Sequence, residues 1–179
     1  MDEKDFDGRV RRHAGAVSAY ARALAPDRWI AEEAVQETFL RAWRYRDRFD
    51  GRGSFEGWLL RICRNCLIDL AAKRPPTEPL PEHFEAPAAL DERHEIYAML
   101  ETLPLAQREV LVLCGLLGYD YDGAAELLGV PVGTVRSRLH RGRAAMAALL
   151  EPDTGVDAAQ QPPGGGRSAR QRLRALRSA

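Results

Sequence analysis

Residues 121–143, YDGAAELLGVPVGTVRSRLHRGR, constrain the fold more than any other part of this 179-residue chain. Gly129 can adopt the positive φ that ends a helix, and Pro131 supplies the φ that suits the start of the next one. Ala124 and Ala125 are small enough to let two helices cross closely. The segment therefore predicts a helix, a tight turn and a second helix, which is the outline of a helix-turn-helix.

On a helical wheel the second helix has an apolar stripe and, opposite it, a basic face. Residues 131–150 carry four arginines and no acidic residue. A helix of this kind fits the DNA major groove, where arginine can bind guanine O6 and N7 while flanking groups bind phosphates. The alternative is an ordinary solvated helix face. The expected inward stripe is Val132, Val135, Leu139, Gly142, Met146, Leu149 and Leu150. The candidate DNA-binding residues are Thr134, Arg136, Ser137, Arg138, His140, Arg141 and Arg143.

Helical periodicity recurs along the chain, and no alternating strand pattern is found, so the predicted fold class is all-α. Asp27 and Ser54 are expected to act as N-caps, and Pro104 as the first residue of a helix. The helices expected before the helix-turn-helix cover residues 6–24, residues 29–45, residue 55 to a stop at residues 73–75, and residues 96–103.

A change in composition divides the chain into parts. Residues 75–89 contain five prolines and three glutamates, which predicts a stiff acidic linker. When extended, such a linker could hold two domains on the order of 50 Å apart. We therefore predict two small helical domains, residues 1–74 and 90–150. Residues 151–179 are expected to form a disordered basic tail or, alternatively, a short basic helix on a partner.

Charge and composition exclude several classes of function. The formal net charge is zero, but residues 75–130 carry 2 basic and 11 acidic groups, so a polyanion suits the basic helix and not the segment before it. No signal peptide or run of membrane length is found, which predicts a cytoplasmic protein without membrane insertion. No catalytic constellation or cofactor motif can be assembled, so we expect neither an enzyme nor a cofactor.

Cys63 and Cys66 form a C-x-x-C pattern within a helical segment. A zinc site needs two further ligands, and the remaining cysteine and histidines form no second pair at ligand spacing, so no metal site is expected. Buried thiols that pack as small apolar side chains are the favoured interpretation, and a thiol-based redox sensor is the alternative.

Four motifs resemble those of the extracytoplasmic-function (ECF) sigma factors, the smallest members of the sigma-70 family of bacterial RNA polymerase initiation subunits. They are EEAVQETFLRAWRYRDRF, GSFEGWLLRICRN, LETLPLAQREVLVL and LLGVPVGTVRSRLHRGR, and the resemblance covers about residues 6–150. It implies that the first domain binds the clamp helices of core RNA polymerase and opens the minus-10 element of promoter DNA. It implies that the second domain reads the minus-35 element and docks near the polymerase flap. An anti-sigma factor is a further implied partner.

The resemblance also implies roles for individual residues. Glu33, Gln36 and Glu37 match the core polymerase-binding surface, although a merely solvated helix face is the alternative. The loop at residues 47–53 and the next helix match the segment that captures an unstacked base, whereas Trp58 is expected in the core. The linker matches a segment that runs through the RNA exit path, or is a plain spacer. The candidate minus-10 residues are Asp47, Arg48, Phe49, Arg52, Gly53, Arg61 and Asn65.

Within the second domain, the motif and the helical wheel select the same residues. Arg136, Ser137, His140 and Arg141 match the base-reading positions of the family, which leaves the other candidates for phosphates. Gly142 replaces a stronger helix former, as does Gly123, which predicts a cost of about 1 kcal/mol relative to alanine. The competing function is a stand-alone regulator that binds DNA as a dimer, but this function leaves the first domain unused.

Overall fold

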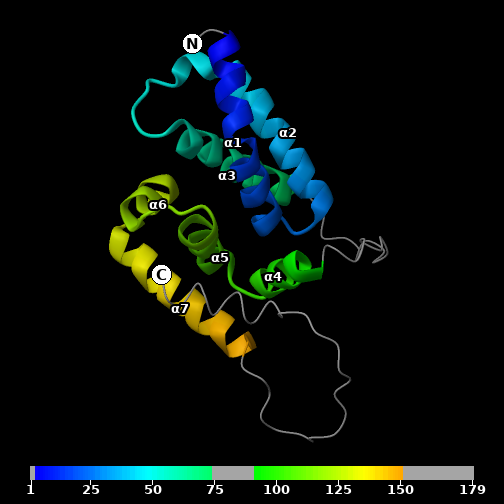
Figure 1. Ribbon diagram of the computed structural model, residues 1–179, viewed down its shortest axis with the longest axis vertical. Coiled ribbons are helices and arrows are strands. Elements are labelled where there is room, and N and C mark those ends of the chain that lie inside the picture. Colours follow the sequence, from blue (N-terminus) through cyan, green and yellow to red (C-terminus); the bar gives the residue numbers. More distant parts are fainter. Residues whose placement is uncertain (1–2, 74–90, 151–179) are drawn as a thin grey trace, which may run out of the picture.

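The computed structural model describes residues 3–73 and 91–150, and within these ranges every regular element is helical (Figure 1). The all-α prediction is thereby confirmed. The predicted linker, residues 75–89, and the predicted tail, residues 151–179, lie outside the described residues. The longer helices are α1 (Glu3–Leu24), α2 (Arg28–Arg44), α3 (Phe55–Lys73), α4 (Asp91–Glu101), α5 (Leu105–Leu111), α6 (Tyr121–Leu128) and α7 (Val132–Leu150).

Short polar side chains start the helices where the sequence predicts them. The Asp27 carboxylate accepts a hydrogen bond from the Ile30 amide at 2.8 Å, and the Ser54 hydroxyl accepts one from the Gly57 amide at 2.9 Å. Each bond satisfies an amide that has no partner within its helix. The prediction for Pro104 is off by one position: its ψ of 137° is extended, so it is the N-cap and α5 begins at Leu105.

Two short helical segments complete the chain. A 3-10 turn, η1 (Arg46–Arg48), follows α2, and a π-helical turn, η3 (Val112–Leu116), follows α5. In η3 the Leu117 amide donates to the Val112 carbonyl at 3.0 Å, five residues back. The wider turn carries the chain from α5 into the helix-turn-helix.

An aromatic cluster joins the loop after α2 to the start of α3. The ring of Phe55 lies 5.2 Å from that of Phe49 and 5.4 Å from that of Trp58, and Phe6 of α1 approaches it edge-on at 6.1 Å. Trp58 is partly buried against the hydrophobic core, in agreement with its predicted core role. The cluster anchors the loop because edge-to-face aromatic pairs add to the free energy gained by burial.

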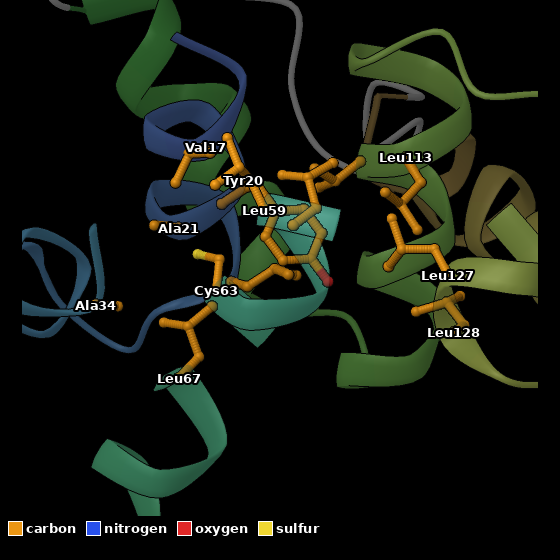
Figure 2. Close-up of a cluster of buried hydrophobic side chains, with 14 of the residues drawn as sticks. Val17, Tyr20, Ala21, Ala34, Leu59, Cys63, Leu67, Leu113, Leu127 and Leu128 are labelled. Atoms are coloured by element: carbon orange, nitrogen blue, oxygen red, sulfur yellow. The ribbon is translucent and has the colours of Figure 1, made fainter. Parts of the chain in front are cut away.

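The two predicted domains share one hydrophobic cluster. Figure 2 shows side chains of α1 and α3, among them Tyr20 and Leu59, facing Leu113, Leu127 and Leu128 of the second half of the chain. Helix α3 contacts α6, and α1 contacts α4 and α5. The linker is long enough to separate the domains, yet in this structure they pack together. We call this contact region the seam.

Among the described residues, no helix combines the length and the apolar character needed to cross a membrane.

Candidate nucleic-acid interface

Helices α6 and α7 form the predicted helix-turn-helix. Asp120 caps α6 by accepting a hydrogen bond from the Gly123 amide at 2.7 Å. A Cβ on Gly123 would lie 2.9 Å from an oxygen of that carboxylate, so the glycine is part of the cap. Gly129 ends α6 with φ of 66° in the left-handed region, as its position predicts. Ala124 and Ala125 are buried, which allows the close crossing of the two helices.

The inward stripe of α7 agrees with the prediction over most of its length. Val135, Leu139, Gly142 and Met146 are buried, on the side that packs against α5 and α6. Leu149 contradicts the prediction because 46% of it is exposed. It lies at the edge of the stripe and in the last turn of the helix, where the apolar face is no longer enclosed.

The outer face of α7 presents the basic residues to solvent. Two contacts order this face: the Arg141 Nε donates to the Ser137 carbonyl at 3.2 Å, and the Arg136 guanidinium lies 5.8 Å from the ring centroid of Tyr121. A helix that is buried on one side and carries exposed guanidinium groups on the other is suited to the major groove. The exposed candidates are Arg136, Ser137, His140, Arg141 and Arg143, and the partly buried ones are Thr134 and Arg138.

The candidate minus-10 residues lie on the loop after α2 and on the exposed side of α3. Gly51 and Gly53 have φ of 76° and 77°, which a residue with a side chain rarely adopts, so the glycines define the loop path. Arg52 is 91% exposed and reaches Asp50 at 3.7 Å. Phe49 packs into the aromatic cluster, so much of its ring is already in contact with protein.

The other candidates differ in what they contact. The Arg48 guanidinium lies 4.9 Å from the ring centroid of Tyr45, and Asp47 and Asn65 are exposed. Arg61 is already paired across the seam, since its Nη2 donates to the side chain and to the main-chain carbonyl of Glu126, both at 3.2 Å.

The three candidate polymerase-binding residues line one groove between α2 and α3. Glu33 and Gln36 are exposed, whereas Glu37 accepts from the Arg41 Nε at 2.6 Å, and Arg41 also reaches Asp69 at 2.8 Å. The groove has a volume of about 300 Å³, and its lining combines charged side chains with the exposed Leu40. Its lining is Glu33, Gln36, Glu37, Leu40, Arg41, Asp69, Leu70 and Lys73.

Cys63 and Cys66 are buried inside the first bundle and have the character of packing residues. Burial raises the pKa of the Cys63 thiol to about 12 and also raises the pKa of Cys66. A reactive thiol needs a lowered pKa and access to solvent, and neither cysteine has them. Within the described ranges, no group of three or more His, Cys, Asp or Glu side chains is placed to hold a metal ion.

The seam contains polar residues that the sequence analysis did not select. The Arg64 Nε donates to Glu109 at 2.8 Å, and the Glu109 side chain is only 6% exposed. The buried Tyr20 hydroxyl, close to both charges, has no hydrogen-bond partner among the described residues. The excess of acid in residues 75–130 was the available signal, because two of these acids, Glu109 and Glu126, pair with Arg64 and Arg61 of α3.

The fold and the exposed residues together define an all-helical DNA-binding protein with a helix-turn-helix in its second half. Comparison with protein families agrees with this class and makes it specific. Residues 9–75 match the sigma-70 region 2 family and residues 93–146 match the sigma-70 region 4 family.

Curated relatives match this chain across both family regions. The chain is 37% identical over 157 residues to the ECF RNA polymerase sigma factor SigC of Mycobacterium tuberculosis, covering 77% of this chain and 85% of the relative. It is 38% identical over 151 residues to the ECF sigma factor SigE of Mycolicibacterium smegmatis, but that match, over 77% of this chain, spans only 58% of the relative's length.

Two solved structures are similar to this chain in both sequence and fold. CnrH in complex with the cytosolic domain of CnrY has a TM-score of 0.70 at 33% identity, covering 86% of this chain and 92% of CnrH. The sigma factor RpoE in complex with the anti-sigma factor NepR, from Bartonella quintana, has a TM-score of 0.69 at 28% identity. This match covers 84% of this chain and 99% of the chain in that structure. The chain belongs to the ECF RNA polymerase sigma factors of the sigma-70 family.

Proposed function

We propose that this ECF sigma factor binds core RNA polymerase, recognises the minus-35 and minus-10 promoter elements and promotes promoter opening, while the polymerase carries out the chemistry. The observation that carries the proposal is the exposed basic face of α7, held outward by its buried apolar stripe. A stand-alone dimeric regulator is not favoured, because it would leave the α2–α3 groove and the loop after α2 without a role.

The minus-35 element is assigned to α7. Arg136 and Arg141 lie near the centre of the exposed face, where a guanidinium can reach guanine O6 and N7. Ser137 and His140 lie beside them and complete the base-reading group. Phosphate contacts are assigned to the residues on the flanks of the face, namely Thr134, Arg138 and Arg143.

The minus-10 element is assigned to the loop after α2 and the exposed side of α3. Extraction of a base from the duplex costs a few kcal/mol, which stacking and hydrogen bonds to the flipped base must offset. The positive-φ backbone at Gly53 permits close approach of the strand, and Arg52 and Asn65 offer exposed donors. Phe49 is assigned a supporting role because its ring packs against Phe55.

The groove between α2 and α3 is proposed to bind the polymerase clamp through Glu33, Gln36 and Glu37. The second domain is proposed to dock near the polymerase flap. We further propose regulation by an anti-sigma factor, because RpoE of Bartonella quintana was solved with one. Since both polymerase and chromosome are cytoplasmic in bacteria, the proposed place of action is the cytoplasm.

Reconstitution with core polymerase tests the proposal. Transcripts made by polymerase with this chain should begin at one set of promoters, and sequencing them defines both elements. A chain that binds a palindrome alone, or that directs no initiation with polymerase, would refute the assignment.

Variants of α7 test the residue roles. Arg136→Ala and Arg141→Ala should each cost about 1–3 kcal/mol at one base pair. Arg143→Ala should instead weaken all sequences equally and reduce the salt slope by about 1. Equal losses on matched and scrambled minus-35 duplexes for Arg136→Ala would contradict its base-reading role.

A further inference from the structure

The outward side of α1 carries basic residues that the proposed function leaves without a role. Residues 8–24 contain four arginines and no acidic residue. Arg9 is paired, since its Nε lies 3.0 Å from Asp5, and its guanidinium also packs on an aromatic ring. The exposed residues of this side, which we call the α1 strip, are Gly8, Arg11, Arg12, Gly15 and Arg22.

The arginines of the α1 strip are not used by the fold. Within residues 3–73 and 91–150, the side chains of Arg11, Arg12 and Arg22 make no hydrogen bond or ion pair. Another exposed arginine, Arg28, does pair, with Glu32 at 2.7 Å. Arg22 lies in the last turn of α1, where a cation favours the helix dipole, but Arg11 and Arg12 lie in mid-helix. Their charge is therefore available to a polyanion.

The two glycines of the α1 strip give it a low profile. Gly8 and Gly15 are seven residues apart, so they lie on the same side of the helix. A Cβ added at either position would have no neighbour within 4 Å, and alanine is favoured over glycine inside a helix. Packing within the described chain thus gives no reason for glycine here. A glycine does let another backbone come close to the helix.

The α1 strip begins beside the surface to which the minus-10 element is assigned. Phe6 lies 5.3 Å from the ring of Trp43 at the end of α2, and the Arg9 guanidinium lies 5.7 Å from the ring centroid of Phe55. Figure 1 shows the first turns of α1 beside η1 and the loop that follows it. Arg12 comes one turn after Arg9, so a strand held at the loop passes onto the strip. At 1.5 Å per residue the strip is about 21 Å long.

A single strand of DNA is the ligand that fits this surface. Opening of a promoter leaves one strand unpaired between the minus-10 element and the start of transcription. Capture of a flipped base fixes only one nucleotide of that strand. Proteins that hold single strands do so with cations that follow the phosphates, and the α1 strip provides such cations next to the captured base.

We propose that the α1 strip binds the sugar–phosphate backbone of the open strand where it leaves the minus-10 surface, with Arg11 and Arg12 on phosphates and Gly15 at the closest approach. The inference rests on the proposed function and adds a contact to it. Phosphate contacts carry no sequence information, so the strip stabilises the open strand at every promoter alike. Arg22 extends the contact toward the end of α1.

Salt dependence tests the phosphate contacts in the full-length chain bound to core polymerase. The probe is a fluorescent single strand that carries the minus-10 sequence found by transcript sequencing and continues about ten nucleotides downstream, within the site sizes of single-strand binding proteins. Each phosphate contact on a single strand contributes about 0.7 to the slope of log K against log salt. Arg11→Gln and Arg12→Gln should each reduce the slope by about that amount in an anisotropy titration.

Two controls separate the α1 strip from the rest of the complex. Arg28→Gln removes the same charge from an exposed but paired arginine and should leave the slope unchanged. A shorter probe that ends at the minus-10 element should give the same slope for Arg11→Gln, Arg12→Gln and the wild-type chain. Wild-type slopes for both variants on the long probe would overturn the proposal and leave the strip to an acidic protein.

The glycine is tested by effects of opposite sign. Gly15→Ala should raise the free energy of unfolding, because alanine favours the helix, and yet weaken binding of the long probe. Damage to the fold would move both quantities in the same direction. Unchanged or tighter binding by Gly15→Ala would overturn the close approach. Failure of the wild-type chain to direct initiation with polymerase would instead refute the proposed function.

Discussion

Replacement of Gly142 by alanine tests how closely α5 approaches α7, the helix that we propose reads the minus-35 element. Gly142 lies on the buried side of α7. A Cβ at this position would lie 2.8 Å from Leu111 Cδ1, 3.1 Å from Leu111 Cγ and 3.5 Å from Gln107 Cβ. The terminal methyl group can rotate away, but Cγ moves only if the leucine or the whole helix shifts.

Two opposing effects decide the sign of the change. Alanine is favoured over glycine within a helix by about 1 kcal/mol. Overpacking of a tight contact costs about 1–3 kcal/mol. Since two atoms of Leu111 are too close, we expect packing to outweigh propensity and Gly142→Ala to lower the free energy of unfolding by about 1 kcal/mol.

Gly133→Ala is the matched control on the same helix. Its added Cβ has no neighbour within 4 Å, so only the propensity gain applies, about 0.5–1 kcal/mol. Urea unfolding followed by circular dichroism measures both variants. With Leu111→Ala as the background, which removes the clashing atoms, Gly142→Ala should become stabilising. If Gly142→Ala stabilises the unmodified chain as much as Gly133→Ala does, the close α5–α7 contact is refuted.

Three further predictions concern a cap, a thiol and a cation–π contact. Asp27→Ala should lower the free energy of unfolding by about 1 kcal/mol, because the Ile30 amide loses its acceptor, and Asp27→Asn should retain most of it in the same urea assay. Burial raises the pKa of Cys63 from 9.0 to about 12, so its contribution to stability is complete below pH 9 and is lost as pH rises toward 12. Urea unfolding at pH 8 and pH 10 should show this fall, and Cys63→Ala should reduce it. Tyr121→Leu should weaken binding to the minus-35 duplex by about 0.5–1 kcal/mol in an anisotropy assay, whereas Tyr121→Phe retains the aromatic face under Arg136.

Local chemistry explains why much of the second domain could be predicted. Gly129, Ala124 and Ala125 act through their own backbone or size, so their roles follow from position alone. The inward stripe of α7 follows from helical periodicity, which gives a side chain's direction relative to its own axis. The same rule misjudged Leu149, because periodicity does not tell where the packing partner ends.

Two features of the second half of the chain, the close contact at Gly142 and the π-helical turn, could not be predicted from the sequence. Gly142 was interpreted as a weak point of α7, since a helical wheel contains no information about Leu111. The π-helical turn at Val112–Leu116 was also missed, because its hydrogen bonds reach one residue further than those of a normal helix while the apolar pattern stays helical. For Gly142 the deciding contact is tertiary, with a side chain of another helix.

The contact between Arg61 and Glu126 at the seam could not be predicted from the sequence either. Arg61 was assigned to DNA from its motif alone, and nothing in residues 55–73 reveals that Glu126, 65 positions later, pairs with it. Segregation of charge along the chain indicated that acidic and basic segments could attract each other, but not which pairs would form. The motif that selects Arg61 as a candidate for DNA binding therefore carries no signal for the contact with Glu126 that the structure shows.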